Sequence, residues 1–184
     1  MQIGSDGMLP GARYIASPNC DRRPEDMSVE LLVIHNISLP PGEFGGPGII
    51  DLFTNNLAPA RHPYYRVIAD LRVSSHFLIR RDGEIIQFVS CALRAWHAGE
   101  SSWRGRSRCN DFSLGVELEG SDDIPFEDAQ YDRLAEITRA LQSRYPIAGI
   151  VGHADIAPGR KTDPGPCFDW ARYFALINPP AASQ

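Results

Sequence analysis

Three side chains in this sequence have the chemistry and spacing to bind one zinc ion. His35 closes the apolar run at residues 31–34, and His153 and Asp163 stand ten residues apart in a late segment. Two imidazoles and one carboxylate fill three corners of a tetrahedron and leave the fourth for water, which is typical of a catalytic zinc site rather than a structural one. The trio therefore indicates metal-assisted chemistry.

Two further residues could complete such a site: Glu117, in the alternating run 114–118, and Lys161, two residues before Asp163. Zinc lowers the pKa of bound water from 15.7 to about 7–9, and a nearby carboxylate can then move the proton. The Lys161 ammonium could stabilise the oxyanion of a tetrahedral intermediate. Metal, base and cation together favour amide hydrolysis. Glu119 stands on the same strand face as Glu117 and meets the same requirement.

Each of these residues also has an ordinary explanation. A lone histidine is more often a hydrogen-bonded structural residue than a ligand. Asp163 begins the sequence Asp-Pro-Gly-Pro, which is typical of a turn. The two glutamates could face solvent or form ion pairs, and Lys161 could be a surface lysine. His35 and His153 are stronger candidates because each follows a strand-like apolar run, and two strand ends can meet at one edge of a sheet.

Length and composition are those of an ordinary globular protein. With 184 residues, 43% hydrophobic and 22% charged, the chain is expected to form a single domain over 1–184, with a core at about 11–177 and a flexible tail at 178–184. The net charge of −5 argues against a nucleic-acid partner. Basic residues nevertheless gather in two short stretches that could hold an anionic ligand or simply face solvent: Arg104, Arg106 and Arg108, and then Arg160 and Lys161.

Sequence features of export and membrane insertion are missing. No apolar run approaches the roughly 20 residues that a membrane span needs. The first ten residues have neither the basic region nor the apolar region of a signal peptide. The four cysteines are scattered, without a Cys-x-x-Cys pair, and we expect them to be reduced in a cytoplasm of bacterial type.

The patterns predict an α/β fold with a mixed central sheet. Strands are expected at 31–34, 114–118 and 147–151, and a hairpin at 76–89 turns at Asp82-Gly83. A helix is expected at 127–144, a weaker one at 48–56, and a last helix that is capped by Asp169. The core-facing stripes of the first and last of these helices are predicted to be Leu134, Ile137, Leu141 and Tyr145, and Trp170, Phe174 and Ile177. Three long loops, 39–48, 92–111 and 152–166, carry or adjoin the candidate ligands.

Several ordered motifs in these segments resemble those of the type-2 N-acetylmuramoyl-L-alanine amidases. The motifs are His35-Asn36-Ile-Ser, Ser75-His-Phe-Leu-Ile with Asp82-Gly-Glu-Ile-Ile, Ala95-Trp-His-Ala-Gly99, Asn110-Asp-Phe-Ser-Leu-Gly-Val-Glu117-Leu-Glu, and Gly152-His153 through Lys161-Thr-Asp163-Pro-Gly-Pro. The resemblance runs from about Gly11 to Ile177, and within the family it is greatest to cytoplasmic members that act on 1,6-anhydro-N-acetylmuramoyl-L-alanine. It implies a fold like that of peptidoglycan recognition proteins, with a mixed sheet flanked by helices and a zinc cleft on one side.

The resemblance also implies roles for individual residues. One zinc ion per chain would be bound by His35, His153 and Asp163, with Glu117 and Lys161 as the catalytic carboxylate and cation. The implied contacts to an anhydromuropeptide are Asn36, Arg72 and Arg108, with Trp96 and Ala98 lining the cleft. The implied reaction is cleavage of the amide bond between 1,6-anhydro-N-acetylmuramic acid and the L-Ala of its stem peptide, in cytoplasmic recycling of wall fragments. A monomer without a membrane partner is expected.

Three other functions stay open on the sequence. The chain could bind muropeptides without cutting them, although such a module has no need of an open-coordination metal. It could instead act on intact peptidoglycan, as phage lysins do. A structural zinc protein would need a fourth protein ligand, and His97 is the best candidate, although cleft structure or a hydrogen bond to a ligand suits that residue better.

Overall fold

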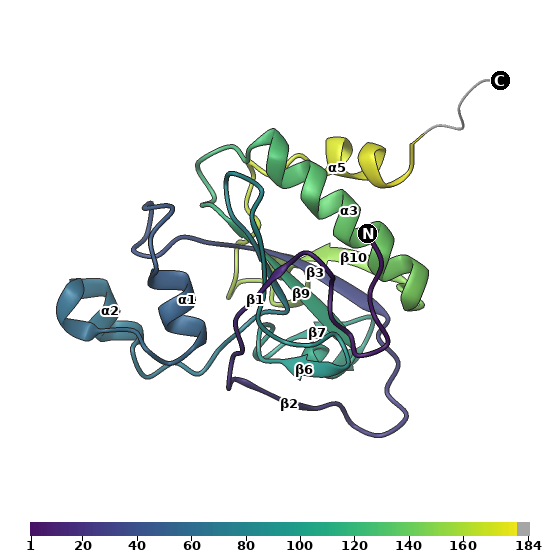
Figure 1. Cartoon of the computed structure of the whole chain (residues 1–184), viewed down its shortest axis with the longest axis horizontal. Coiled ribbons are helices and arrows are strands. Elements are labelled where there is room, and N and C mark those ends of the chain that lie inside the picture. Colours follow the sequence, from purple (N-terminus) through teal and green to yellow (C-terminus); the bar gives the residue numbers. More distant parts are fainter. Residues whose placement is uncertain (180–184) are drawn as a thin grey trace.

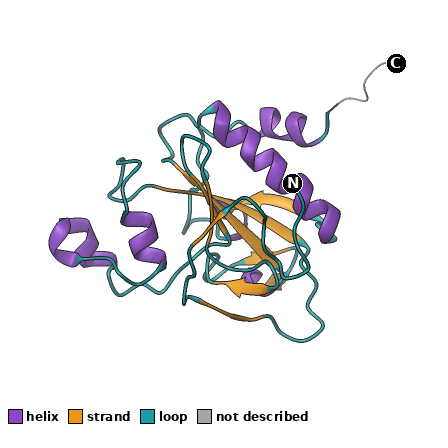
Figure 2. Ribbon diagram, in the orientation of Figure 1, coloured by secondary structure: helices purple, strands orange, loops and turns teal. Residues whose placement is uncertain are grey.

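The computed structural model describes residues 1–179, and its centre is a six-stranded mixed sheet (Figure 1, Figure 2). Across the sheet the order is β1 (Arg13–Tyr14), β5 (Ile85–Gln87), β4 (Phe77–Ile79), β9 (Ser113–Glu119), β3 (Leu31–Ile37) and β10 (Gly149–Gly152). Neighbouring strands run parallel except for the antiparallel pair β4–β5. The predicted mixed sheet is confirmed. Residues 180–184 of the expected tail lie outside the described residues.

The strands β3 and β9, with seven residues each, are adjacent interior strands of the sheet, and residues on both of their faces are buried. Leu32 and Ile34 of β3 belong to the large core beneath the helices, while the residues between them face the other side. In β9 the same alternation sends Leu114 and Val116 to the large core and leaves Gly115 and Glu117 on the opposite face. This opposite face carries the candidate site.

Helix α3 (Asp128–Arg144) lies over the face of the sheet that carries the large core, and α5 (Trp170–Ile177) packs against α3 (Figure 1). Helix α3 confirms the predicted helix, with its buried stripe at Leu134, Ile137 and Leu141. Helix α5 begins after Asp169, whose carboxylate accepts a hydrogen bond from the Arg172 amide at 2.9 Å. The predicted stripe of α5 was partly wrong. Tyr173 is fully buried there, whereas Phe174 is 40% exposed and stacks on Trp170 at the surface.

A second group of short elements lies beside the sheet. Helices α1 (Gly48–Phe53) and α2 (Pro63–Ile68), joined through the 3-10 turn η1 (Pro59–Arg61), stand at one end of the molecule, away from α3 and α5 (Figure 1). They pack on a separate apolar cluster with Leu78 and Ile86 of the sheet. The remaining elements are β2 (Cys20–Arg22) paired with β6 (Leu93–Ala95), β7 (Ser102–Trp103) paired with β8 (Arg106–Ser107), the 3-10 turn η2 (Cys109–Asp111), and α4 (His153–Ile156). All of them except β2, which precedes β3, lie in the long loops 92–111 and 152–166.

Two further expectations concern the surroundings of the protein. Among residues 1–179, no helix has both the length and the apolar character needed to cross a membrane. All four cysteine thiols are free: Cys20, Cys91, Cys109 and Cys167.

Candidate active site

The adjacent strands β3 and β10 bring two imidazoles together at one edge of the sheet. Their register pairs Ile34 with Gly152, and His35 and His153 follow directly. The Nδ1 atoms of the two rings are 3.0 Å apart, and Asp163 Oδ2 is 3.1 Å from each of them. Three potential ligand atoms that are far apart in the sequence thus form a nearly equilateral triangle.

This triangle fits a zinc ion. Tetrahedral zinc with bonds of about 2.0–2.1 Å places its ligand atoms about 3.3 Å from one another, close to the observed spacing. Burial lowers the pKa of His35 to about 4, so its ring is neutral and offers a lone pair. Burial opposes ionisation of Asp163, but contacts with His153 and His35 outweigh it and lower the carboxyl pKa. Two imidazoles and one carboxylate are a donor set that zinc accepts.

The loop that carries Asp163 folds back on α4 through backbone hydrogen bonds. The Ala154 amide donates to the Asp163 carbonyl at 2.9 Å, and the amides of Arg160 and Lys161 both donate to the Ala157 carbonyl at 3.1 Å. Gly152 permits this approach, because a Cβ atom there would lie 2.7 Å from Cδ of Pro164. The turn expected from Asp-Pro-Gly-Pro and the ligand expected from its first residue are therefore compatible.

Glu117 is the carboxylate beside the trio. It pairs with His35 in the β3–β9 register, so both side chains lie on the same face of the sheet. Glu117 is 8% exposed, and its Oε2 atom has no hydrogen-bond partner within the described residues. Burial, and then the charge of Asp163, raise the pKa of the Glu117 carboxyl well above its usual range, and the Lys161 charge opposes the increase. A buried carboxylate with a free oxygen is suited to accept a proton.

Glu119, the alternative on the same strand face, has a different partner. Its Oε1 atom accepts hydrogen bonds from Arg80 and from the Gly45 amide, each at 2.7 Å. Arg80 also donates to the Gly46 carbonyl at 2.9 Å. Glu119 therefore neutralises a buried arginine and fixes the loop at 39–48.

A cleft of about 360 Å³ opens over these groups. Lys161 is exposed and lines it together with Glu117 and Asp163, so the cation and the carboxylates face one space. The opposite wall is apolar and comes from α1, α2 and the segment that follows α2: Leu52, Phe53, Tyr64, Ile68, Leu71 and Val73. A ligand in this cleft would meet a charged floor and an apolar wall.

Two of the expected substrate contacts, Asn36 and Arg72, are held by hydrogen bonds inside the protein. Asn36 lines the cleft, but its amide nitrogen donates to Asp122 Oδ1 at 2.7 Å and to the Pro164 carbonyl at 3.0 Å. It therefore tethers the loop that carries the Asp163 carboxylate. Arg72 is exposed and donates to the carbonyls of Ala69 and Leu71, both at 3.1 Å. Contact of Arg72 with a substrate stays a prediction.

Trp96 and Ala98 differ in their access to a ligand. Trp96 is half-buried, and its amide donates to the Asn19 carbonyl at 3.3 Å. Ala98 is completely buried, so the expectation that it lines the cleft was wrong for its side chain. Its methyl group packs in an apolar cluster below the sheet, and its carbonyl accepts from His153 Nε2 at 3.1 Å and from Arg160 at 2.8 Å. Ala98 therefore contacts the candidate metal ligand His153 through its backbone carbonyl.

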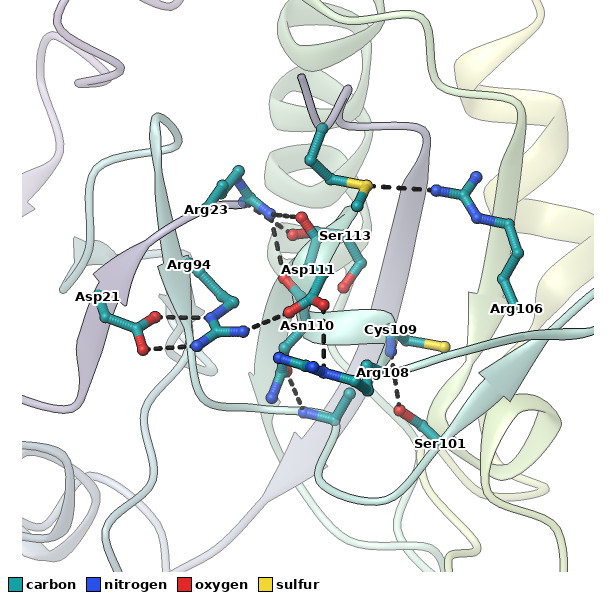
Figure 3. A network of polar contacts seen from close by, with 12 residues as sticks. Asp21, Arg23, Arg94, Ser101, Arg106, Arg108, Cys109, Asn110, Asp111 and Ser113 are labelled. Atoms are coloured by element: carbon teal, nitrogen blue, oxygen red, sulfur yellow. Dashed lines mark hydrogen bonds and ion pairs between the residues drawn. The ribbon is translucent and has the colours of Figure 1, made fainter. Parts of the chain in front are cut away.

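Arg108 ends a row of alternating charges (Figure 3). Asp21 accepts two hydrogen bonds from Arg94, both at 2.6 Å, and Arg94 also pairs with Asp111. Asp111 Oδ2 then lies 3.3 Å from Nε of Arg108, whose backbone has the left-handed φ of +62° that a non-glycine residue rarely adopts. The Arg108 side chain is 71% exposed, which leaves it free to meet a ligand.

The basic stretches of the sequence do not form one anion site. Arg106 pairs with Glu30 at 2.7 Å and lies over the Phe112 ring, while Arg104 lies over Trp103. Arg160 donates to backbone carbonyls, as described above, so Lys161 is the member of its stretch that faces the cleft.

The structural-zinc hypothesis needed His97 as a fourth ligand, and the geometry places this residue elsewhere. His97 Nδ1 lies 2.9 Å from Nε2 of His35, on the side of that ring opposite the trio. The candidate metal group in the described part of the chain contains three residues only, His35, His153 and Asp163. A position for a non-protein ligand is therefore left open.

Asn110 was missed as a functional residue by reasoning from the sequence. Its side-chain oxygen accepts from the amides of His97 at 3.1 Å and Ala98 at 2.8 Å, and so fixes the segment behind the trio. Asn110 begins one of the motifs that carry the family resemblance, but the residue type does not indicate which backbone amides its side chain contacts. That information exists only once the loop 92–111 is folded.

Comparison with known proteins identifies the family of this chain. The sequence model of the N-acetylmuramoyl-L-alanine amidase family matches residues 25–166. The chain is 60% identical over 176 residues to the 1,6-anhydro-N-acetylmuramyl-L-alanine amidase AmpD of Citrobacter freundii, covering 95% of this chain and 94% of that protein.

Solved structures give the same result. The crystal structure of a selenomethionine derivative of AmpD superposes with a TM-score of 0.94 at 60% identity, covering 96% of this chain and 99% of the other. The amidase AmiD of Escherichia coli, in complex with anhydro-N-acetylmuramic acid-L-Ala-D-γ-Glu-L-Lys, has a TM-score of 0.61 at 33% identity over 84% of this chain and 60% of that one. The chain therefore belongs to the N-acetylmuramoyl-L-alanine amidase family.

Proposed function

We propose that this amidase is zinc-dependent and hydrolyses the bond between 1,6-anhydro-N-acetylmuramic acid and the L-Ala of its stem peptide. The observation that carries the proposal is the triangle of His35, His153 and Asp163 with the free Oε2 atom of Glu117 in the same cleft. The substrate class is supported by 60% identity to a 1,6-anhydro-N-acetylmuramyl-L-alanine amidase over almost the whole of both chains.

The trio would hold the ion through two imidazole nitrogens and a carboxylate oxygen. Zinc held there would supply Lewis acidity, lowering the pKa of water to about 7 and polarising the scissile carbonyl. The chain itself supplies the burial that keeps His35 neutral and the loop contacts that keep Asp163 in place.

Proton transfer falls to Glu117. Its carboxylate takes a proton from the water whose oxygen attacks the amide carbon, and delivers it to the nitrogen as the C–N bond breaks. The products are the carboxylic acid of the muramyl lactyl group and the free amine of L-Ala. The raised pKa of Glu117 supports this role because it increases the affinity of the carboxylate for the proton. Lys161 on the cleft wall stabilises the oxyanion that develops on the carbonyl.

Substrate recognition is assigned to Asn36, which lines the cleft, and to Arg72, Arg108 and Trp96. Arg72 and Arg108 would bind carboxylates of the substrate, because both guanidinium groups are exposed. Asn36 and Trp96 would contact the muropeptide beside them. Free cysteine thiols fit a reducing compartment, and we place the enzyme in the cytoplasm as a monomer that recycles wall fragments.

The test is mass spectrometry of products from a synthetic anhydromuropeptide and, separately, from polymeric peptidoglycan, with and without a chelator. Release of the free peptide from the anhydromuropeptide, abolished by the chelator and restored by zinc, is the expected result. Binding without cleavage would favour a recognition module. Faster release from the polymer would favour a lysin-like amidase.

A further inference from the structure

A third buried imidazole, that of His97, stands directly behind the candidate metal group. His35 presents Nδ1 to the trio, and its other nitrogen, Nε2, lies 2.9 Å from Nδ1 of His97. The second nitrogen of His97 lies 3.1 Å from the hydroxyl of Ser113. The two rings meet edge to face, with an interplanar angle of 88°. A continuous row of hydrogen-bonding groups therefore runs from the trio through His35 and His97 to Ser113.

We propose that His97 is a positioning residue for the metal site. Its Nδ1 atom accepts a hydrogen bond from the Nε2–H group of His35, and this leaves the Nδ1 lone pair of His35 free for the metal. This inference rests on the proposed zinc dependence. The two nitrogens at 2.9 Å share one proton, and it belongs to one ring at a time. If it sits on His97 Nδ1, neutral His35 must carry its own proton on Nδ1, where it points into the trio and blocks a metal. If it sits on His35 Nε2, the site can bind a metal.

The surroundings of His97 let it take the accepting role. Its Nε2 proton can be donated to Ser113, because a hydroxyl oxygen accepts as readily as it donates. His76, the other nearby imidazole, does not compete for these nitrogens. His76 Nδ1 accepts from the Gly115 amide at 3.0 Å, which leaves its Nε2 proton for the Leu93 carbonyl at 3.1 Å.

His153 is held from behind by the residue next to His97. Its Nε2 atom lies 3.1 Å from the Ala98 carbonyl, a group that can only accept, so the proton of His153 is fixed on Nε2. His97 and Ala98 thus orient the two candidate imidazole ligands from adjacent positions in the chain. Their amides share one acceptor, the side-chain oxygen of Asn110. Arg23 in turn donates to the backbone carbonyls of Asn110, at 3.1 Å, and Ser113, at 2.9 Å. These contacts can be followed in Figure 3.

The sheet provides the space for this ring at Gly115. A Cβ atom on Gly115 would lie 2.6 Å from two atoms of the His97 imidazole, a distance that real Cβ atoms do not adopt. Gly115 stands on β9 two residues before Glu117, on the face that carries the site. The missing side chain in the middle of a buried strand is therefore explained by the ring that occupies its place.

The proposal is tested by zinc affinity, measured in competition with a chromophoric chelator at fixed pH. His97→Phe keeps a ring but cannot accept, and its zinc dissociation constant should increase by about 10–100-fold. His97→Asn places an amide oxygen near the position of Nδ1, and should retain more affinity than His97→Phe. His62→Phe, a change in a histidine that caps α2 away from the trio, is the control and should leave zinc affinity unchanged. Melting of each zinc-free variant establishes that it is folded.

Imidazole nitrogen shifts in the 15N-labelled wild-type protein provide a second test that needs no variant. With zinc bound, His35 should carry its proton on Nε2, and His97 should be unprotonated on Nδ1. A His97 ring protonated on Nδ1, or a folded His97→Phe variant with wild-type zinc affinity, would overturn the inference. Failure of the wild-type protein to bind zinc would instead overturn the proposed function, so the two failures are distinguishable.

Discussion

His35 and Glu117 lie directly opposite each other on the parallel strands β3 and β9. The register places a candidate metal ligand and the candidate base on one face of the sheet, on two adjacent interior strands. Neither side chain depends on a flexible loop for its position. The spacing between the candidate ligand and the candidate base is therefore fixed by the pairing of two strands, as expected for a pre-organised site.

Glu117→Gln should separate catalysis from metal binding. The amide keeps the shape of the side chain but cannot take a proton, so kcat should decrease by about 10²–10⁴-fold while zinc remains bound. Turnover of the anhydromuropeptide and zinc content are the two measurements. Near-normal turnover by the variant would remove Glu117 from the mechanism.

The same variant should make the zinc-free protein more stable, with a specific pH dependence. The pKa of Glu117 is raised in the folded state, so folding favours the protonated form and loses stability as the carboxyl ionises. Below about pH 4.3, the pKa of a glutamate in the unfolded state, ionisation of Glu117 should make no difference between the free energies of unfolding of the wild type and the variant. As the pH rises through the folded pKa, the free energy of unfolding of the wild type should decrease relative to Glu117→Gln. Denaturant unfolding at a series of pH values measures the difference, and a constant difference would contradict this explanation.

Glu119→Ala should have the opposite effect on stability. It removes the close partner of Arg80, whose side chain is 10% exposed, and leaves this buried charge with only the more distant Glu84 carboxylate, at 3.9 Å. The free energy of unfolding should decrease by about 3–5 kcal/mol. A small effect in urea unfolding would mean that water or another group compensates Arg80. The contrast between Glu117 and Glu119 tests whether one of two carboxylates on the same strand face is functional and the other structural.

Arg108→Ala should increase KM for the anhydromuropeptide with a smaller change in kcat. Loss of a charge-assisted contact worth about 1.5–3 kcal/mol corresponds to roughly a 10–150-fold increase. Arg106→Ala is the matched control, since this neighbouring arginine pairs with Glu30 and should leave KM unchanged. Equal KM values for the two variants would exclude Arg108 from substrate binding.

The sequence predicted the long elements well because each has a clear hydrophobic pattern. The helix at 127–144 and the strand at 114–118 have a regular period, the strand at 31–34 is a continuous apolar run, and all three appear close to the expected bounds. Helix α2 spans six residues and begins with Pro63, so it offered too short a pattern to detect. Phe174 was misplaced because two adjacent aromatic residues compete for one face, and tertiary packing selected Tyr173.

Within the site, residue type was informative and residue contact was not. The trio could be predicted because metal binding restricts the choice of side chains. Ala98 contacts His153 through its backbone carbonyl, and Asn110 accepts hydrogen bonds from backbone amides. Contacts that involve the backbone do not require a particular residue type, so the sequence does not reveal them. Glu117 and Glu119 could not be separated by strand alternation, because only Arg80 and the folded loop at 39–48 distinguish their surroundings.

The central claim is that His35, His153 and Asp163 bind one zinc ion. Metal analysis combined with zinc titration of the wild type and of Asp163→Ala tests it most directly. We predict one tightly bound zinc per wild-type chain, and a dissociation constant that is larger by orders of magnitude in the folded variant, because the only anionic ligand of the trio is lost. A folded wild-type protein that takes up no zinc, or a variant that binds zinc as tightly as the wild type, would contradict the account.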